Sequence, residues 1–222
     1  MALNLNPAPI TYKSFPEEGT ARNTEQMPKL IAEGRIPLSV AGLMEARLKY
    51  GKTLPNWMDN YFDTGDAVVY HPNGNLKIVL DSEHLRKINP QSELRAGALV
   101  LPGGVYDTIK GQEFKRSDLE KHTGDWLSAR EVKKNPLWKI LARDQNLLNE
   151  YTDFFFSEAK QRFSYDKNMG LYLDSASDVP KLRAWCVDGL EVRSSAYGRG
   201  SLDIGSGRLV GVSAGGAEVS KK

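Results

Sequence analysis

The sequence predicts an α+β fold in which antiparallel hairpins pack around one long central helix, with several short helices beside it. Three observations support this prediction. One long amphipathic run covers residues 135–163, two hairpin signatures lie at 67–80 and 182–195, and strands do not alternate regularly with helices. With 222 residues, of which 40% are hydrophobic, the chain is long enough to bury a sizeable core.

We expect three segments: an extended N-terminal arm over 1–27, a single α+β domain over 28–213 and a flexible C-terminal tail over 214–222. The arm is predicted from three prolines and the lack of helical or strand periodicity. Two hypotheses remain open for it, a loosely ordered terminus and a strap that holds a second copy in a homo-oligomer.

Two short helices are expected after the arm. Pro28 suits the first turn of one, which Gly34 ends. Ser39 caps the next, which ends at Gly51.

The clearest strand signal is a hairpin at 67–80. Asn73-Gly74 separates two apolar runs and is the preferred pair for a two-residue type I′ loop. This loop sets a register in which Val69 faces Ile78 and Ala67 faces Leu80.

Ser117 and Ser128 are each followed three residues later by glutamate, the pattern of a capping box, and predict two short helices. The long helix follows, with Asn135 as its cap and Phe163 at its end. Asp144 falls on the apolar face of this helix, where a carboxylate needs a partner or a raised pKa. It is therefore a candidate catalytic residue, and the alternative is a structural salt bridge or a helix cap contributed by another element.

The C-terminal third predicts short strands at 171–173 and 208–212 and a hairpin in which Asp188-Gly189 joins 182–187 to 190–195. Residues 194–201 are rich in glycine and serine. They suit either a hairpin connection or a loop whose backbone amides hold an anion.

An acidic cluster lies near the base of the first hairpin. In the predicted register Asp66 sits opposite Asp81, with Asp63 and His84 close in sequence. Facing carboxylates repel unless they share a cation, so a divalent metal site is one hypothesis. The alternative gives these residues ordinary turn and cap positions.

The stretch from Lys110 to Arg143 is locally basic, with nine lysines and arginines against five acidic residues. Two short helices joined by a glycine-containing turn invite comparison with a helix-turn-helix, although Glu120 and Asp125 fit that motif poorly. The candidate nucleic-acid-binding residues are Lys115, Arg116, Arg130, Lys133 and Lys134. A solvated helix face is the alternative.

Other classes lack their signatures. The single cysteine, Cys186, excludes an internal disulfide framework, and no His-Glu-x-x-His or Gly-x-Ser-x-Gly pattern occurs. No run approaches the roughly 18 apolar residues of a membrane span, and no signal peptide is recognisable, so we expect a cytoplasmic, soluble protein without membrane association.

Two functional hypotheses follow. The first is a binding or interaction protein, whose partner is either a protein or a nucleic acid, the nucleic acid being contacted through 110–143. The alternative is a small metal-assisted hydrolase or transferase that uses the acidic cluster.

Overall fold

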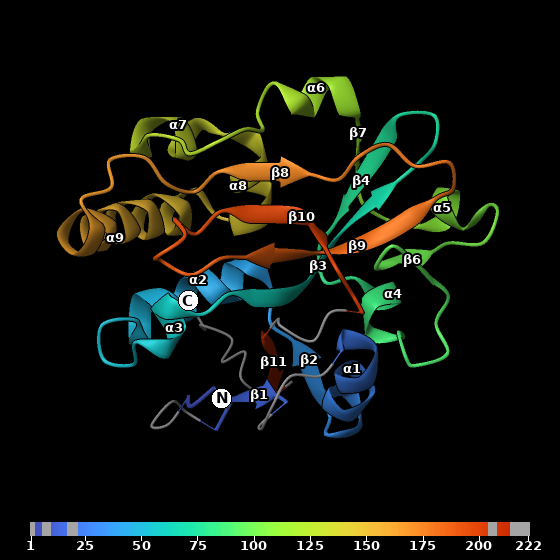
Figure 1. The fold of residues 1–222 in the computed structure, drawn as a ribbon, viewed down its shortest axis with the longest axis horizontal. Helices are drawn as coiled ribbons and strands as arrows, with labels where there is room; N and C mark the ends of the chain where they lie inside the picture. Colours follow the sequence, from blue (N-terminus) through green and yellow to red (C-terminus); the bar gives the residue numbers. More distant parts are fainter. Residues whose placement is uncertain (1–2, 6–9, 17–21, 204–207, 214–222) are drawn as a thin grey trace, which may run out of the picture.

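The computed structural model describes residues 3–5, 10–16, 22–203 and 208–213. Its described part holds a single sheet of eleven strands and nine helices (Figure 1). The strands are β1 (Tyr12–Phe15), β2 (Arg35–Pro37), β3 (Phe62–Tyr70), β4 (Asn75–Val79), β5 (Leu94–Arg95), β6 (Ala98–Val100), β7 (Gln112–Lys115), β8 (Leu171–Leu173), β9 (Lys181–Val187), β10 (Ala196–Gly200) and β11 (Arg208–Ser213). The helices are α1 (Asn23–Ala32), α2 (Val40–Tyr50), α3 (Asn56–Asp59), α4 (Glu83–Arg86), α5 (Val105–Thr108), α6 (Arg116–Glu120), α7 (Ala129–Lys134), α8 (Pro136–Ala142) and α9 (Gln145–Phe163).

The main path through the sheet runs β1-β11-β3-β9-β10-β8. Antiparallel pairs predominate, and β10 with β8 and β11 with β3 pair in parallel. β3 is central, and all nine of its residues are buried. Its alternate side chains enter two separate apolar clusters: Val68 and Tyr70 pack with α2, α8 and α9, whereas Ala67 and Val69 pack with α1 and α4.

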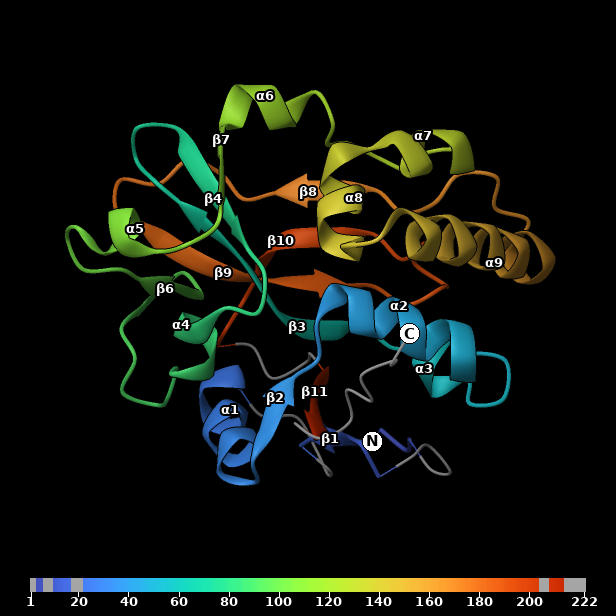
Figure 2. The ribbon, with the colours of Figure 1, turned by 180° about the vertical axis from the view of Figure 1, so that it is seen from behind.

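The helices cover the sheet unevenly. Figure 2 shows α2, α8 and α9 in front of the sheet when the molecule is seen from behind. Figure 1 shows no helix in front of β8 and β10 from the opposite side. None of the described helices therefore covers this side of β8, β10 and the adjoining end of β9, which we call the uncovered region of the sheet.

The prediction of an α+β protein is confirmed, but the prediction of one long helix over 135–163 is wrong. Asn135 does cap a helix, as expected, and its side chain accepts hydrogen bonds from the amides of Leu137 and Trp138. That helix, α8, ends at Arg143, whose φ of 63° lies in the left-handed region. α9 then starts anew at Gln145, so two shorter helices replace the single scaffold.

The first hairpin exists, but its predicted register is wrong by one residue. Val68 faces Ile78 and Ala67 faces Val79, and the His71 amide donates to Asn75 O. The loop thus has three residues, ending in Gly74 with a φ of 87°. A two-residue type I′ loop needs two residues with positive φ. The three-residue loop needs positive φ only at its last residue, which here is Gly74.

The short elements were predicted with mixed success. Ser39 and Ser128 cap α2 and α7, the latter in a full capping box, as expected. Ser117 lies inside α6, and Lys115 takes its N-cap position without a side-chain bond. In the second hairpin, β10 begins only at Ala196, after a turn over 188–195.

The range predicted as an arm contains regular structure in its described residues. β1 pairs with β11, and α1 begins at Asn23 with Pro28 inside the helix. The domain boundaries and the strap over a second copy stay predictions, and the predicted tail lies outside the described residues. None of the described helices combines the length and the apolarity that a bilayer crossing requires.

Candidate binding surface

The uncovered region of the sheet carries a lateral row of polar and aromatic side chains. Strand register places Asp63, Cys186, Tyr197 and Tyr172 side by side on β3, β9, β10 and β8. Directly opposed residues point to the same face of a sheet, so these four share one face. The neighbouring row of apolar residues points inward to the helices: Phe62, Val187, Ala196 and Leu171.

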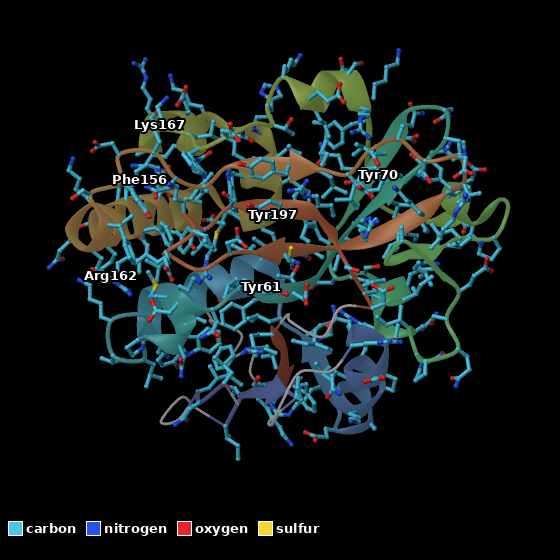
Figure 3. All side chains as sticks on the ribbon, viewed as in Figure 1. Tyr61, Tyr70, Phe156, Arg162, Lys167 and Tyr197 are labelled. Atoms are coloured by element: carbon cyan, nitrogen blue, oxygen red, sulfur yellow. The ribbon has the colours of Figure 1, made fainter. Side chains whose placement is uncertain are left out.

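Two tyrosines and an arginine form the centre of this face. The rings of Tyr172 and Tyr197 are stacked, with centroids 4.7 Å apart and planes 8° apart. The Arg199 guanidinium lies 5.0 Å from the Tyr197 ring centroid and 5.5 Å from that of Tyr172. We call Tyr172, Tyr197 and Arg199 the aromatic face; Figure 3 shows Tyr197 turned toward the viewer.

The alternation along β10 explains how the strand presents these side chains. Tyr197 and Arg199 point outward, whereas Ala196, Gly198 and Gly200 are buried. A Cβ on Gly198 would lie 2.8 Å from Val68 Cγ2, so the inward positions need very small residues. The Tyr70 hydroxyl also donates to Gly198 O at 2.6 Å, which fixes the strand to the core.

A second arginine lies between aromatic rings beside this face. The Arg193 guanidinium is 3.8 Å from the Trp126 centroid and 3.6 Å from the Tyr165 centroid. Its Nη1 donates to Lys167 O at 2.8 Å. Trp126 remains 44% exposed, an unusual position for so large an apolar side chain.

The turn over 188–195 is held from behind by Arg47, a fully buried residue of α2. Its Nη1 donates to Ser194 Oγ at 2.8 Å and to the Tyr151 hydroxyl at 2.9 Å. Its Nη2 donates to the Asp188 carbonyl at 2.8 Å. This buried guanidinium therefore joins α2, α9 and the turn that leads into β10.

Burial raises the pKa values of ionisable groups in this row and beside it. Burial raises the pKa of Asp63 from 3.8 to about 6, although the Asn23 side chain opposes the shift. Burial also raises the pKa of Asp188. The hydrogen bond with Tyr197 and the positive charges of Arg47 and Arg199 act in the opposite direction and lower it, but burial is the larger effect. The pKa of the Cys186 thiol is raised well above its usual value, chiefly by burial, so this thiol is not activated.

The residues proposed as metal ligands lie in different settings. Asp63 belongs to the lateral row, whereas Asp66 accepts hydrogen bonds from the amides of Val40 and Asp81. Arg143 forms ion pairs of 2.7 Å with both Asp66 and Asp81. His84 lines cavities near α4. Within the described ranges, no three histidine, cysteine or acidic residues converge as metal ligands.

The predicted nucleic-acid-binding residues are divided among β7, α6 and α7. Helices α6 and α7 have five and six residues, and Arg116 pairs with Glu120 while Lys133 pairs with Asp153. Lys115 ends β7, and Arg130 and Lys134 are exposed on α7. These contacts partly neutralise the basic region that the sequence indicates.

Asp144, the candidate catalytic residue, is the N-cap of α9. Its Oδ1 accepts a hydrogen bond from the Leu147 amide at 2.8 Å. It is exposed rather than buried, because the break at Arg143 rotates it away from the apolar face. Asp144 is thus a helix cap, but of its own helix, whereas the alternative drawn from the sequence involved another element.

No protein-family model matches this sequence, and no curated protein matches it. Among solved structures, the chain is similar to one described as "Accommodation of massive sequence variation in Nanoarchaeota by the C-type lectin fold". The TM-score is 0.66, with 16% identity over 91% of this chain and 95% of that chain. The similarity identifies a C-type lectin fold, which replaces the expected arrangement of hairpins around a central helix.

Proposed function

We propose that this protein is a binding protein that recognises a protein partner through the aromatic face. The observation that carries the proposal is the stacked pair of Tyr172 and Tyr197 with Arg199 on an uncovered part of the sheet. Tyrosine, tryptophan and arginine are the residues most enriched at the energetic centres of protein interfaces. Trp126 and Arg193 extend the same chemistry toward α9.

The solved structure of similar fold supports the proposal in one further way. It is described as accommodating massive sequence variation. In this chain the outward Tyr197 and Arg199 of β10 flank Gly198, which packs against the core. Such a strand separates recognition from stability, because an outward side chain can change without altering the core.

Two other hypotheses draw less support. Nucleic-acid contact through Lys115, Arg116, Arg130, Lys133 and Lys134 competes with the ion pairs of that region. A metal-assisted reaction at Asp66 and Asp81 competes with Arg143, which already compensates both carboxylates. A protein partner for the aromatic face is therefore the proposal that the contacts favour.

The test replaces Tyr197 with the photo-crosslinking residue p-benzoylphenylalanine and captures partners from an extract of the source cells. The same residue at Lys139, on exposed α8 surface, is the matched control. A protein captured only from position 197 is then titrated against the wild-type chain and a Tyr172→Ala, Tyr197→Ala double variant.

We expect the double variant to weaken binding at least tenfold, because truncating central aromatic side chains removes large contact area. Equal affinity for wild type and double variant would contradict the proposal. Binding of RNA whose affinity falls steeply with salt, and is lost on Arg130→Ala and Lys133→Ala, would favour the nucleic-acid hypothesis instead.

A further inference from the structure

A pocket opens at the edge of the aromatic face, where the uncovered part of the sheet meets the part covered by α1. Its cavity is about 260 Å³. This is smaller than the pockets that enclose whole small-molecule ligands, and it suits a single side chain. Its lining residues belong to β3, β9 and β10 or directly flank these strands: Tyr61, Asp63, Cys186, Asp188, Tyr197, Arg199, Gly200 and Ser201.

Asp63 gives this pocket its chemical character. Asp63 is only 4% exposed, and its carboxyl group is hydrogen-bonded to the neutral side chain of Asn23. Two other carboxylates with little exposure form ion pairs. Asp66 pairs with Arg143, and Asp174 pairs with Lys181 and Arg183. Within the part of the chain that the structure describes, no lysine, arginine or histidine forms such a pair with Asp63.

Burying a carboxylate without a cation is costly, and the cost appears here as the raised pKa of Asp63. A cation that enters the pocket would remove part of that cost. Asp188 lines the same cavity and adds a second carboxyl group. With both carboxyl groups ionised and Arg199 as the lining cation, the pocket carries one excess negative charge.

The walls suit a cationic side chain as well. Tyr61 and Tyr197 line the cavity, and aromatic faces attract ammonium and guanidinium groups. Figure 3 shows Tyr61 near Tyr197 on the same side of the molecule. Gly200 lies directly beside this carboxyl group: a Cβ there would stand 3.6 Å from Asp63 Oδ1 and only 2.7 Å from Ala184 O, so the strand requires glycine at this position.

We propose that this pocket receives one lysine or arginine side chain of the partner, with its charged group at Asp63 and its stem against Tyr61 and Tyr197. The proposal rests on the proposed function. It adds that the partner bound at the aromatic face places a basic side chain in the adjoining pocket. A partner therefore presents a basic residue at the margin of an apolar or aromatic contact patch.

The test titrates ¹⁵N-labelled protein with N-acetyl-lysine methylamide and N-acetyl-arginine methylamide and follows the amide signals of Cys186, Gly200 and Ser201. N-acetyl-norleucine methylamide is the uncharged control of similar shape. We expect saturable shifts with a basic probe and at least fivefold weaker binding in Asp63→Asn. Asp153→Asn, an exposed change on α9, should bind like wild type.

Shifts that are equal for the norleucine and the basic probes, or no shifts, would overturn the proposal. The Asp63→Asn spectrum shows directly whether that variant is folded, and Asp188→Asn provides a second loss of charge in the same pocket. If both are folded and bind the probes like wild type, the proposal is wrong.

The identified partner separates this proposal from the proposed function. Loss of partner binding in the tyrosine double variant but not in Asp63→Asn keeps the proposed function and rejects the pocket. Probe binding at the pocket combined with a partner indifferent to both tyrosines keeps the pocket and rejects the proposed function.

Discussion

Arg143 Nη2 and Asp66 Oδ1 lie 2.7 Å apart, although 77 residues separate them in the chain. Arg143 is the residue at which α8 ends in the left-handed conformation, and Asp66 is a fully buried residue of β3. Asp66 also accepts the amide of Val40 at the first turn of α2. The break between α8 and α9 therefore coincides with the ion pair that ties this corner to the sheet.

Replacing Arg143 with alanine should reduce the free energy of unfolding by about 3 kcal/mol, because it leaves the buried Asp66 without its cation. Urea unfolding measures the change. Arg143→Gly separates the ion pair from backbone strain, because glycine adopts a φ of 63° without steric cost. We expect the free energy of unfolding of the glycine variant to be about 1 kcal/mol higher than that of the alanine variant and still well below that of wild type. A glycine variant as stable as wild type would show that the ion pair contributes no more than the roughly 1 kcal/mol that glycine gains from relief of strain.

Asp144→Ala should cost about 1 kcal/mol, since it removes the side chain that accepts the Leu147 amide at the start of α9. Asp144→Ser retains a capping oxygen and should recover most of that loss in thermal unfolding. If serine and alanine are equally destabilising, the cap is not the role of this residue.

Asp63 should make stability fall as the pH rises. Its pKa in the folded state is about 6, above its ordinary value of 3.8, so the folded state holds the proton more tightly. The contribution is full below pH 4 and is lost as the pH rises through 6, with a maximum of roughly 3 kcal/mol. We therefore compare the free energies of unfolding of Asp63→Asn and wild type in denaturant titrations. Between pH 4 and pH 7.5 the difference should change in favour of Asp63→Asn by up to this amount. Parallel curves for the two proteins would contradict the assigned shift.

Gly198→Ala should destabilise the protein by roughly 1–3 kcal/mol, because the new methyl group would meet Val68, Tyr70 and Trp185. Arg199→Ala, one residue further on the outward side, should change stability by only about 0.5 kcal/mol. Melting temperatures of the two variants test the alternation along β10. Equal effects would mean that the strand does not separate an inward from an outward side.

Local signals in the sequence predicted much of the local structure. Ser39, Ser128 and Asn135 were correctly identified as caps because a cap depends only on the next three or four residues. The 67–80 hairpin was found from its turn residues, and its register failed because Asn-Gly also occurs in three-residue loops. The α8–α9 break was missed since apolar periodicity continues across Arg143, and the reason for the break lies in Asp66.

The aromatic face could not be predicted from local patterns, because Tyr172 and Tyr197 meet only through the parallel pairing of β8 and β10. One signal was available nevertheless. In the segment 196–200, small residues alternate with Tyr197 and Arg199, which is the period of a strand that has one tightly packed side. Its glycines instead favoured a loop.

The sheet order has a consequence for how the chain reaches its final form. β11 lies between β1 and β3, and it also pairs with β2. During synthesis from the N-terminus, these three strands must wait for residues 208–213 before their edges are paired. Contacts between such distant segments slow folding and leave strand edges exposed in the meantime. Completion of the sheet is therefore a late event, in which the last described strand enters between the earliest ones.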